Sequence, residues 1–273
     1  MRARILDGKA LAAEIRAEVA AAAAAFQAEA GRAPGLGVVL VGDDPASRSY
    51  VNGKEKACAA AGIRSREIHL PARADRTEIL AAVRALNADE TVDGILVQLP
   101  LPEPASEREV IEAIDPAKDV DGFHPVNVGR LVQGLPAFAP CTPAGVLEIL
   151  RHAGIPLAGA AVVVIGRSQI VGRPLSVLLS RKGVDATVTL CHTRTRDLAR
   201  HTREADIVVV AAGRPHTLTA DMVKPGVVVI DVGVNRIPDP ARATGYRLAG
   251  DVDFEAVAAK AAAITPVPGG VGP

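Results

Sequence analysis

The chain has few of the residues that mark extracellular, disulfide-bonded or metal-binding proteins. Its 273 residues include no tryptophan, two tyrosines and only three cysteines, Cys58, Cys141 and Cys191. The cysteines are scattered and odd in number and form no CxxC pair, so we expect reduced thiols and no disulfide framework. The six histidines are equally dispersed and form no HxxxH pair. No metal site is therefore expected.

Neither charge nor hydrophobicity points to nucleic acid or a membrane. Lysine plus arginine and aspartate plus glutamate both number 31, so the formal net charge is zero and no overall basic field attracts nucleic acid. Asp7, Lys9 and Glu14 interrupt the segment where a signal peptide needs an apolar core. No apolar run reaches the roughly 20 residues of a transmembrane helix. We expect a soluble, cytoplasmic protein.

What the chain does contain is a hydrophobic content of 49% arranged in alternating apolar runs and helical patterns. In the first half, alanine-rich or periodic segments predict helices, and short apolar runs ended by glycine or proline predict strands. The expected elements are a helix over 8–30, a strand over 37–41, a helix over 47–61, a strand over 63–70, a helix over 77–87 and a strand over 94–99. This β–α order favours a parallel sheet covered on both faces.

A second β–α alternation begins after a proline-rich stretch at 135–143. It predicts a helix over 144–153 and a second helix that follows the loop 166–174 and ends at residue 181. The predicted strands are 161–165, 187–191, 207–211 and 227–230. A chain of 273 residues is long enough to form two domains. We therefore expect an α/β fold with two domains, 1–139 and 140–273, and a cleft between them.

A candidate small-molecule site begins with the segment Tyr50-Val51-Asn52-Gly53-Lys54. Side chains four apart on a helix are neighbours, so Tyr50 and Lys54 reach the same side. Gln98 ends an apolar strand, and Asp121 lies in the segment Asp119-Val120-Asp121-Gly122. An aromatic ring, an amine, an amide and a carboxylate together suit recognition of a small organic molecule.

The segment from Val162 to Pro174 reads as a strand, a glycine-containing loop and the start of a helix. That order aims backbone N–H groups and the positive end of a helix at a phosphate. Ser168 stands where the strict GxGxxG pattern has its second glycine, so an ordinary βα turn remains an alternative reading.

The end of the next strand favours NADP over NAD. An NAD site usually places an acidic residue there to hold the ribose hydroxyls. Here the strand ends Leu190-Cys191-His192-Thr193-Arg194, without an acid. Arg167, Thr193 and Arg194 are suited instead to a 2′-phosphate.

Taken together, the ordered motifs closely resemble the bifunctional methylenetetrahydrofolate dehydrogenase/cyclohydrolase family over essentially all 273 residues. The resemblance rests on Tyr50-Val51-Asn52-Gly53-Lys54, Gln98-Leu99-Pro100-Leu101-Pro102, Lys118-Asp119-Val120-Asp121-Gly122, Gly166-Arg167-Ser168, Gly172-Arg173-Pro174, Gly233-Val234-Asn235, Gly250-Asp251-Val252-Asp253 and Pro266-Val267-Pro268-Gly269-Gly270-Val271-Gly272-Pro273.

The resemblance implies two activities in one-carbon metabolism. A dehydrogenase step moves hydride from 5,10-methylenetetrahydrofolate to NADP, and a cyclohydrolase step opens the resulting 5,10-methenyl cation to 10-formyltetrahydrofolate. It implies that 1–139 is a folate-binding, catalytic domain, that 140–273 is a Rossmann-like NADP-binding domain, and that the enzyme is a homodimer.

The resemblance also implies roles for individual residues. Lys54 is the acid/base group, Gln98 hydrogen-bonds it, Tyr50 packs on the folate and Asp121 holds the pterin. Further substrate-binding positions are Ser47, Leu99, Pro100, Pro268, Gly269 and Gly270. Ser47 has a second reading as a helix N-cap. The cofactor-binding positions are Gly166, Arg167, Ser168, Val171, Gly172, Pro174, Thr193, Arg194, Gly213 and Val234.

Two alternatives to the bifunctional hypothesis keep the fold. One is a dehydrogenase without effective cyclohydrolase activity, and the other is a non-catalytic NADP-binding sensor. The family sequence continues past Gly-Val-Gly-Pro into a helix that packs on the first domain, whereas this sequence ends at Pro273.

Overall fold

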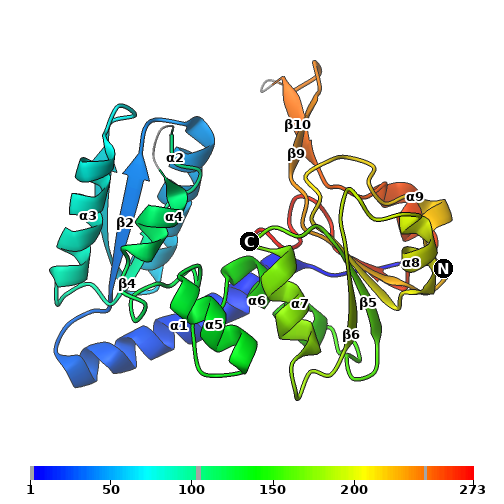
Figure 1. Ribbon diagram of the computed structural model, residues 1–273, viewed down its shortest axis with the longest axis horizontal. Coiled ribbons are helices and arrows are strands. Elements are labelled where there is room, and N and C mark those ends of the chain that lie inside the picture. Colours follow the sequence, from blue (N-terminus) through cyan, green and yellow to red (C-terminus); the bar gives the residue numbers. More distant parts are fainter. Residues whose placement is uncertain (1–2, 103–105, 243–244) are drawn as a thin grey trace. The chain divides into compact units, whose positions relative to one another are not determined.

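The computed structural model describes residues 3–102, 106–242 and 245–273 and divides into two compact units. The N-terminal unit is Ala13–Ala139, and the C-terminal unit combines Met1–Ala12 with Pro140–Pro273. Figure 1 shows both units as helices around strands. The chain passes from one unit to the other twice, after Ala12 and after Ala139. The first twelve residues, which the sequence assigned to the first domain, group with the C-terminal unit.

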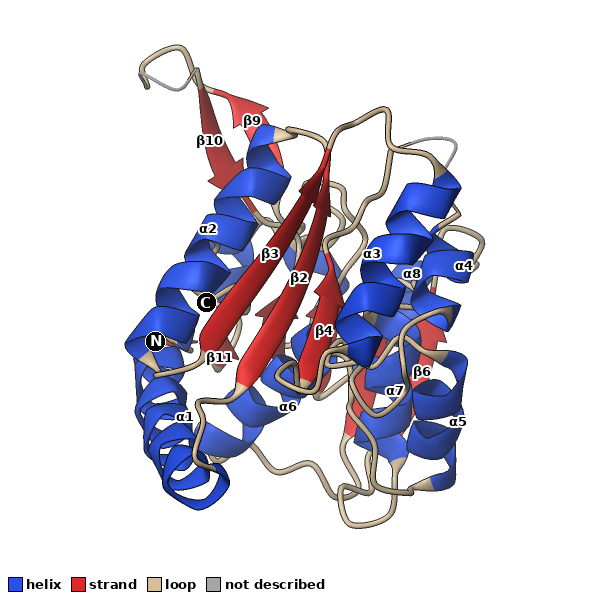
Figure 2. Cartoon of the chain, turned by 90° about the vertical axis from the view of Figure 1, so that its left-hand side faces the viewer, coloured by secondary structure: helices blue, strands red, loops and turns tan. Residues whose placement is uncertain are grey.

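The N-terminal unit is built on a parallel sheet of three strands in the order β3-β2-β4. Its strands are β2 (Gly35–Val41), β3 (Arg64–Leu70) and β4 (Gly94–Val97). Alternate residues of β2 face opposite sides: Val39 and Val41 pack with the cluster that includes Ile79 of α3, whereas Val38 and Leu40 pack with Val51 of α2. Figure 2 shows α2 and α3 on either side of the strands. The expected coverage of both faces is confirmed.

The helices of this unit start where side chains satisfy free backbone N–H groups. They are α1 (Gly8–Ala30, whose first residues belong to the C-terminal unit), α2 (Pro45–Ala60), α3 (Arg76–Ala88), α4 (Glu107–Glu112) and α5 (Pro125–Gln133). Asp44 caps α2 by accepting a hydrogen bond from the Ser47 N–H at 2.8 Å, so the N-cap reading of Ser47 is wrong. Asp75 and Glu78 form a capping box on α3.

Strand β4 is shorter than the sequence predicted. The Gln98 N–H still donates to the Val39 carbonyl at 2.9 Å, but the Leu99–Pro100 peptide is cis and the strand has ended at Val97. Proline has no N–H with which to continue a ladder. The residues after Val97 therefore leave the sheet as a loop.

The C-terminal unit is built on a six-stranded parallel sheet in the order β1-β11-β8-β7-β5-β6. The strands are β1 (Arg4–Ile5), β5 (Ala161–Ile165), β6 (Thr187–Cys191), β7 (Ile207–Val210), β8 (Val228–Asp231) and β11 (Ala263–Ile264). Arg4 pairs with Ala263, which explains why the first residues belong to this unit. Strands β5, β7 and β8 carry valine and isoleucine on both faces, as expected of a sheet buried on both sides.

Helices cover the two faces of this sheet. They are α6 (Cys141–His152), α7 (Gly172–Ser180), α8 (Leu198–Glu204), the 3₁₀ turn η1 (Ala220–Met222) and α9 (Phe254–Ala258). Leu150 of α6 and Leu175 of α7 pack on one face, and Val257 of α9 packs on the other. Within the part of the chain that the structure describes, every helix is too short or too polar to span a bilayer.

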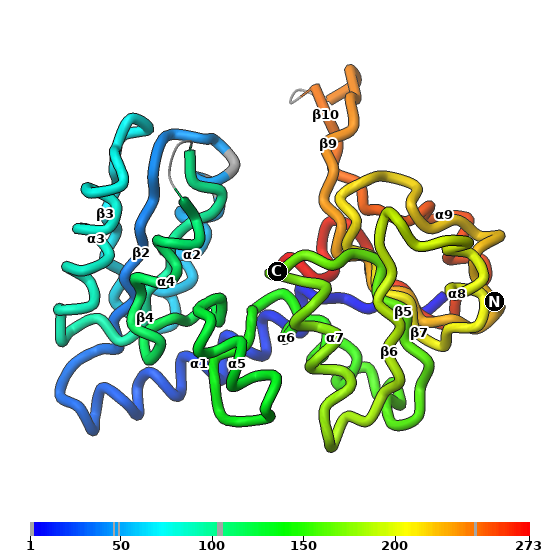
Figure 3. The backbone as a smooth tube through the Cα atoms, in the orientation of Figure 1, coloured from blue at the N-terminus to red at the C-terminus, as the bar shows by residue number. Residues whose placement is uncertain are grey.

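A hairpin that the sequence did not predict projects from the C-terminal unit (Figure 3). It consists of the antiparallel strands β9 (Asn235–Pro238) and β10 (Tyr246–Ala249). The Arg236 guanidinium lies 5.0 Å from the centre of the Tyr246 ring, a cation–π contact across the two strands.

The strand order fixes where a ligand is expected in the C-terminal unit. Strand β5 lies between β6 and β7, so the chain leaves β5 in one direction, returns over it after β6, and continues on its other side. In parallel α/β sheets, ligands bind beyond the carboxyl ends of the strands at such a reversal. The loops after β5, β6, β7 and β8 all begin at that edge.

We expect Leu86→Ala to destabilise the N-terminal unit by about 2–5 kcal/mol, because it empties a filled core position. Leu86 is 0% exposed, and its methyl groups fill the space beside Gly37. Leu135→Ala is the matched control, since Leu135 is 48% exposed and should change the free energy of unfolding by less than about 0.5 kcal/mol. Urea denaturation measures both. Equal effects of the two substitutions would contradict this description of the core.

Candidate active site

Lys54 and Gln98 are brought together from a helix and a strand end. Lys54 Nζ donates a hydrogen bond to Gln98 Oε1 at 3.2 Å. The Gln98 amide is itself oriented, because its Nε2 donates to the Leu99 carbonyl at 2.8 Å and leaves the oxygen for the lysine. The amine is thus held by a neutral acceptor rather than by a carboxylate, and it stays available for proton transfer.

Tyr50 and Ser47 lie on the same helix as Lys54, towards its start. Tyr50 precedes Lys54 by one helical turn, and with 58% of its surface exposed its ring is accessible for stacking. Ser47 is buried in the first turn, where its N–H is already bonded to Asp44. Helix α2 therefore presents an exposed ring and a partly buried amine on one side.

The segment 118–122 contains two aspartates with different surroundings. Asp119 is 1% exposed and accepts hydrogen bonds from the His124 N–H at 2.8 Å and from Asn127 Nδ2 at 2.9 Å. Lys118 Nζ donates to the Asn87 and Asp89 carbonyls at the end of α3, at 2.9 Å each. Lys118 and Asp119 therefore hold the segment in place.

Asp121 is the member of this segment that faces the lysine. Among the described residues, none donates a hydrogen bond to its carboxylate. Burial raises the pKa of Asp121 to about 6; the positive charge of Lys54 opposes that rise and the negative charge of Asp119 adds to it. A partly buried carboxylate without donors is well placed to accept hydrogen bonds from a ligand.

Gly122 shapes the turn after Asp121. Its φ is +66°, and a Cβ there would lie 2.7 Å from the Phe138 carbonyl oxygen. Only glycine combines that conformation with that close approach. The remaining expected positions in this unit, Leu99 and Pro100, directly follow Gln98 in the loop after β4.

Pro268, Gly269 and Gly270 lie in the C-terminal unit, after β11. The Val267–Pro268 peptide is cis, and the Gly269 carbonyl accepts a hydrogen bond from the Gly8 N–H at 3.0 Å. A Cβ on Gly8 would lie 1.5 Å from the Gly270 carbonyl oxygen, so the first residue of α1 and this loop are in direct backbone contact. The expected substrate positions are thus divided between the two units.

The loop after β5 is folded too tightly for larger residues at its two glycines. Gly166 has φ of +126°, and a Cβ there would lie 2.2 Å from the Ala211 carbonyl oxygen. A Cβ on Gly172 would lie 1.9 Å from the Gly166 carbonyl oxygen. Ser168 Oγ accepts a hydrogen bond from the Val171 N–H at 3.1 Å.

The helix that follows this loop, α7, begins at Gly172 with Pro174 in its first turn, and no side chain caps it. An uncapped helix start beside a tight glycine loop suits a phosphate group. The residues present therefore fit a dinucleotide's phosphates.

Thr193 and Arg194 follow β6, the neighbour of β5. The Gly166 N–H donates to the Cys191 carbonyl at 2.9 Å, which ties the two strand ends together. Arg167, Thr193 and Arg194 are all exposed. Two arginines and a hydroxyl thus stand at neighbouring strand ends, where they suit an anionic group.

Gly213 and Val234 complete the edge, after β7 and β8. Gly213 has φ of +66° and donates its N–H to Asp251 Oδ2 at 2.8 Å, while Val234 is exposed. All ten expected cofactor positions therefore lie in loops or helix starts that follow the adjacent strands β6, β5, β7 and β8.

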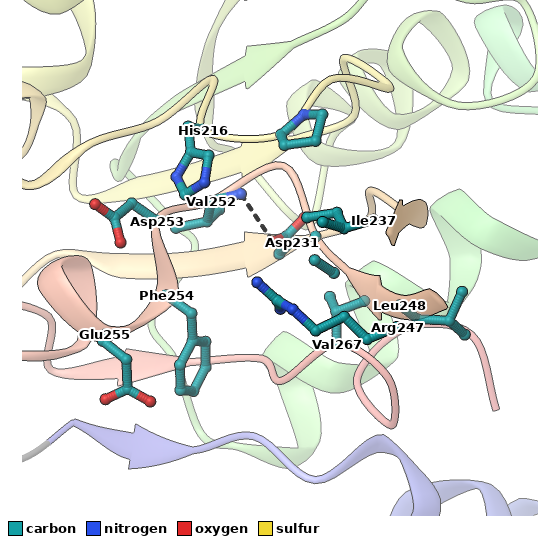
Figure 4. A pocket seen from close by; sticks show the side chains of 13 residues that line it. His216, Asp231, Ile237, Arg247, Leu248, Val252, Asp253, Phe254, Glu255 and Val267 are labelled. Atoms are coloured by element: carbon teal, nitrogen blue, oxygen red, sulfur yellow. Dashed lines mark hydrogen bonds between the residues drawn. The ribbon is translucent and has the colours of Figure 1, made fainter. Parts of the chain in front are cut away.

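The structure also contains a pocket of about 270 Å³ in the C-terminal unit, which Figure 4 shows. It lies beside the hairpin, and none of the residues to which the sequence assigned a catalytic or binding role lines it. Its lining includes Asp231, which forms a pair of buried carboxylates with Asp251, and the two neighbours of Asp251, Gly250 and Val252. Sequence reasoning missed this pair. The motifs Gly233-Val234-Asn235 and Gly250-Asp251-Val252-Asp253 were the available signal for that pair.

Comparison with known families matches both parts of the chain. Residues 6–121 match the catalytic domain of tetrahydrofolate dehydrogenase/cyclohydrolase, and residues 140–273 match the NAD(P)-binding domain of the same enzyme.

Relatives match over nearly their whole length. The bifunctional protein FolD of Desulfovibrio desulfuricans is 56% identical over 271 residues, 98% of this chain and 93% of the relative. The crystal structure of the Campylobacter jejuni bifunctional enzyme FolD is 49% identical, with a TM-score of 0.92 over 98% of this chain and 92% of that one. The Trypanosoma brucei FolD, complexed with NADP and an inhibitor, is 41% identical, with a TM-score of 0.94 over 99% and 92% of the two chains. The chain belongs to the tetrahydrofolate dehydrogenase/cyclohydrolase family.

Proposed function

We propose that this chain is a bifunctional one-carbon folate enzyme. It oxidises 5,10-methylenetetrahydrofolate with NADP to the 5,10-methenyl cation and hydrolyses that cation to 10-formyltetrahydrofolate. The observation that carries the proposal is the hydrogen bond from Lys54 Nζ to Gln98 Oε1 beside the partly buried Asp121 carboxylate. A non-catalytic sensor would not need that arrangement, and a dehydrogenase alone would not need the lysine.

The two units take different parts of the reaction. The N-terminal unit carries Lys54, Gln98, Tyr50 and Asp121, and we assign folate binding and catalysis to it. We assign NADP binding to the C-terminal unit, with its glycine loop and six-stranded parallel sheet. The family match to a catalytic and an NAD(P)-binding domain supports this division.

The dehydrogenase step requires alignment more than acid or base chemistry. When bound, NADP supplies the nicotinamide that accepts the hydride. The tight turn at Gly166 and Gly172 holds the phosphates against the start of α7, and the substrate is held by the N-terminal unit. No side chain needs to form a covalent bond to the folate.

The cyclohydrolase step requires proton transfers. Water adds to the methenyl carbon and loses a proton, and a ring nitrogen gains one before the C–N bond breaks. Lys54 can accept the first proton and deliver the second, because its amine is partly buried and aimed by Gln98. Gln98 orients the Lys54 nitrogen through a neutral amide oxygen, without the negative charge that a carboxylate would place beside it.

The remaining residues orient the folate. The exposed Tyr50 ring offers a face for stacking, and the Asp121 carboxylate accepts paired hydrogen bonds from the amino-pyrimidine edge of the pterin. Ser47 lies one turn before Tyr50 on α2, and Leu99 and Pro100 directly follow Gln98 in the chain. Pro268, Gly269 and Gly270 form the backbone loop that we assign to the substrate in the C-terminal unit.

Arg167, Thr193 and Arg194 explain the choice of NADP. Their exposed side chains at the ends of β5 and β6 suit the 2′-phosphate. The family resemblance further supports a cytoplasmic homodimer. The balanced charge supports the absence of a nucleic-acid partner.

Lys54→Met should lower the cyclohydrolase rate by about 100-fold or more, because it removes the proton carrier. The assay follows loss of the methenyl cation in the absence of nucleotide. Lys56→Met is the matched control: Lys56 is exposed on the same helix, two residues away, and its loss should leave the rate unchanged. A Lys54→Met enzyme as fast as the wild type would contradict the assignment.

Asp121→Asn should raise the KM for the folate, because the pterin loses a charged acceptor.

The same substitution should remove a pH-dependent loss of stability. The pKa of Asp121 is raised from 3.8 to about 6. Between these two pH values the folded protein keeps a proton on Asp121 that the unfolded chain has lost, so the free energy of unfolding falls as the pH rises. Relative to Asp121→Asn, the wild type should therefore lose up to about 3 kcal/mol of unfolding free energy between roughly pH 4 and pH 6. Urea denaturation across that range tests this, and a difference independent of pH would refute it.

Arg194→Gln should raise the KM for NADP about tenfold, because one charge-assisted hydrogen bond to the 2′-phosphate is lost. The KM for NAD, which lacks that phosphate, should not rise. Arg181→Gln is the control, since Arg181 is an exposed arginine at the other end of α7. Parallel increases for NADP and NAD would show that Arg194 does not read the 2′-phosphate.

A further inference from the structure

Two carboxylates are buried at the carboxyl edge of the six-stranded sheet. Asp231 is 2% exposed at the end of β8, and Asp251 is 0% exposed just after β10. Among the described residues, no cationic side chain forms an ion pair with either one. A buried carboxylate is costly unless hydrogen bonds replace its water. Its partners therefore show what the pair holds in place.

Asp231 is satisfied by backbone N–H groups. Its Oδ1 accepts hydrogen bonds from the Gly233 and Asp251 N–H groups at 3.0 Å each, and its Oδ2 accepts one from the Val252 N–H at 3.0 Å. Figure 4 shows the last of these as a dashed line. Burial raises the pKa of Asp231, and these three bonds oppose the rise. Asp231 thereby fixes the backbone on either side of Asp251.

Asp251 reaches across to two other loops. Its Oδ2 accepts hydrogen bonds from the N–H groups of Ala212 at 2.7 Å and Gly213 at 2.8 Å, in the loop after β7. Its Oδ1 accepts one from Asn235 Nδ2 at 2.7 Å, at the start of the hairpin. One side chain thus joins the loop after β7 to the segment after β8.

Two glycines exist where these carboxylates leave no room. A Cβ on Gly233 would lie 2.2 Å from Asp251 Oδ1, and a Cβ on Gly250 would lie 1.8 Å from Asp231 Oδ2. Gly233 and Asn235 of the first motif, Gly233-Val234-Asn235, both contact Asp251 of the motif Gly250-Asp251-Val252-Asp253, so each motif requires the other. They form a single hydrogen-bonded unit rather than two independent sites.

The loop that Asp251 holds also forms the wall of the glycine turn. Ala211 directly precedes Ala212, and its carbonyl oxygen is the group that a Cβ on Gly166 would meet at 2.2 Å. A shift of the Ala212–Gly213 backbone would move that wall against the start of the phosphate loop.

We propose that Asp251 is a positioning residue for the dinucleotide. Its carboxylate holds the Ala212–Gly213 backbone in the shape that receives NADP, and it acts through that backbone rather than by touching the substrate. This inference rests on the NADP-dependent function proposed above. It assigns the buried aspartate pair to cofactor affinity rather than to folate chemistry.

The test compares Asp251→Asn with Asp253→Asn in the full chain. An asparagine at 251 offers one oxygen, so its NH2 group must face either the two backbone N–H groups or Asn235 Nδ2. Asp253 lies in the same motif, and its side chain makes no cap hydrogen bond to α9, so it is the matched control. Titration calorimetry with NADP gives the dissociation constant, and methenyl hydrolysis without nucleotide reports the folate site.

We expect the dissociation constant for NADP to rise about tenfold or more in Asp251→Asn. The hydrolysis rate should stay at the wild-type value, and Asp253→Asn should match the wild type in both assays. An unchanged dissociation constant in Asp251→Asn would overturn the inference while leaving the proposed function intact. A wild type that binds no NADP would overturn the proposed function itself. Equal losses of binding and hydrolysis would mean that the residue supports folding only, which also overturns the inference.

A second variant covers the case in which Asp251→Asn does not fold. Asn235→Ala keeps the Asp251 charge and both bonds to Ala212 and Gly213, and it removes the donor that aligns Oδ1. It should raise the dissociation constant for NADP in the same direction but less, again without affecting hydrolysis. No rise in this folded variant would overturn the inference.

Discussion

Parallel strands all end at the same edge of their sheet, and both large sheets of this chain are parallel. This constraint brings together residues that lie far apart in the sequence. In the N-terminal unit, the loop after β2 carries Asp44, which caps the helix of Tyr50 and Lys54. The loop after β4 begins with Gln98, which accepts a hydrogen bond from Lys54. In the C-terminal unit, the loops after four adjacent strands carry every assigned cofactor position.

The hydrogen-bond partners of three aspartates separate structural from functional carboxylates. Asp119 and Asp251 are bonded to N–H groups of their own unit, and each holds a segment that carries an assigned binding residue. Asp121 is partly buried near Lys54, and among the described residues it has no donor. Because burial without a partner is unfavourable, Asp121 is the carboxylate that a ligand would satisfy.

Much of the fold follows from sequence pattern, and the exceptions depend on long-range pairing. The apolar runs at 161–165 and 187–191 form strands over those same residues, and the alanine-rich segment 8–30 forms α1. The two-residue strands β1 and β11 could not be predicted, because each exists only through its partners. The residues that we assign to the site were recognisable as motifs, but spacing alone could not distinguish Asp119 from Asp121. Nor could it reveal that Asp251 bonds to residues 38 and 39 positions away.

One chain carries both steps, the oxidation of the folate and its hydrolysis. The most direct measurement is a single progress curve of the wild-type enzyme with 5,10-methylenetetrahydrofolate and NADP, recording NADPH and the methenyl cation separately. NADPH should accumulate while the methenyl cation is converted to 10-formyltetrahydrofolate faster than it hydrolyses in buffer. NADPH formation with methenyl decay at the buffer rate would contradict it and leave a dehydrogenase alone.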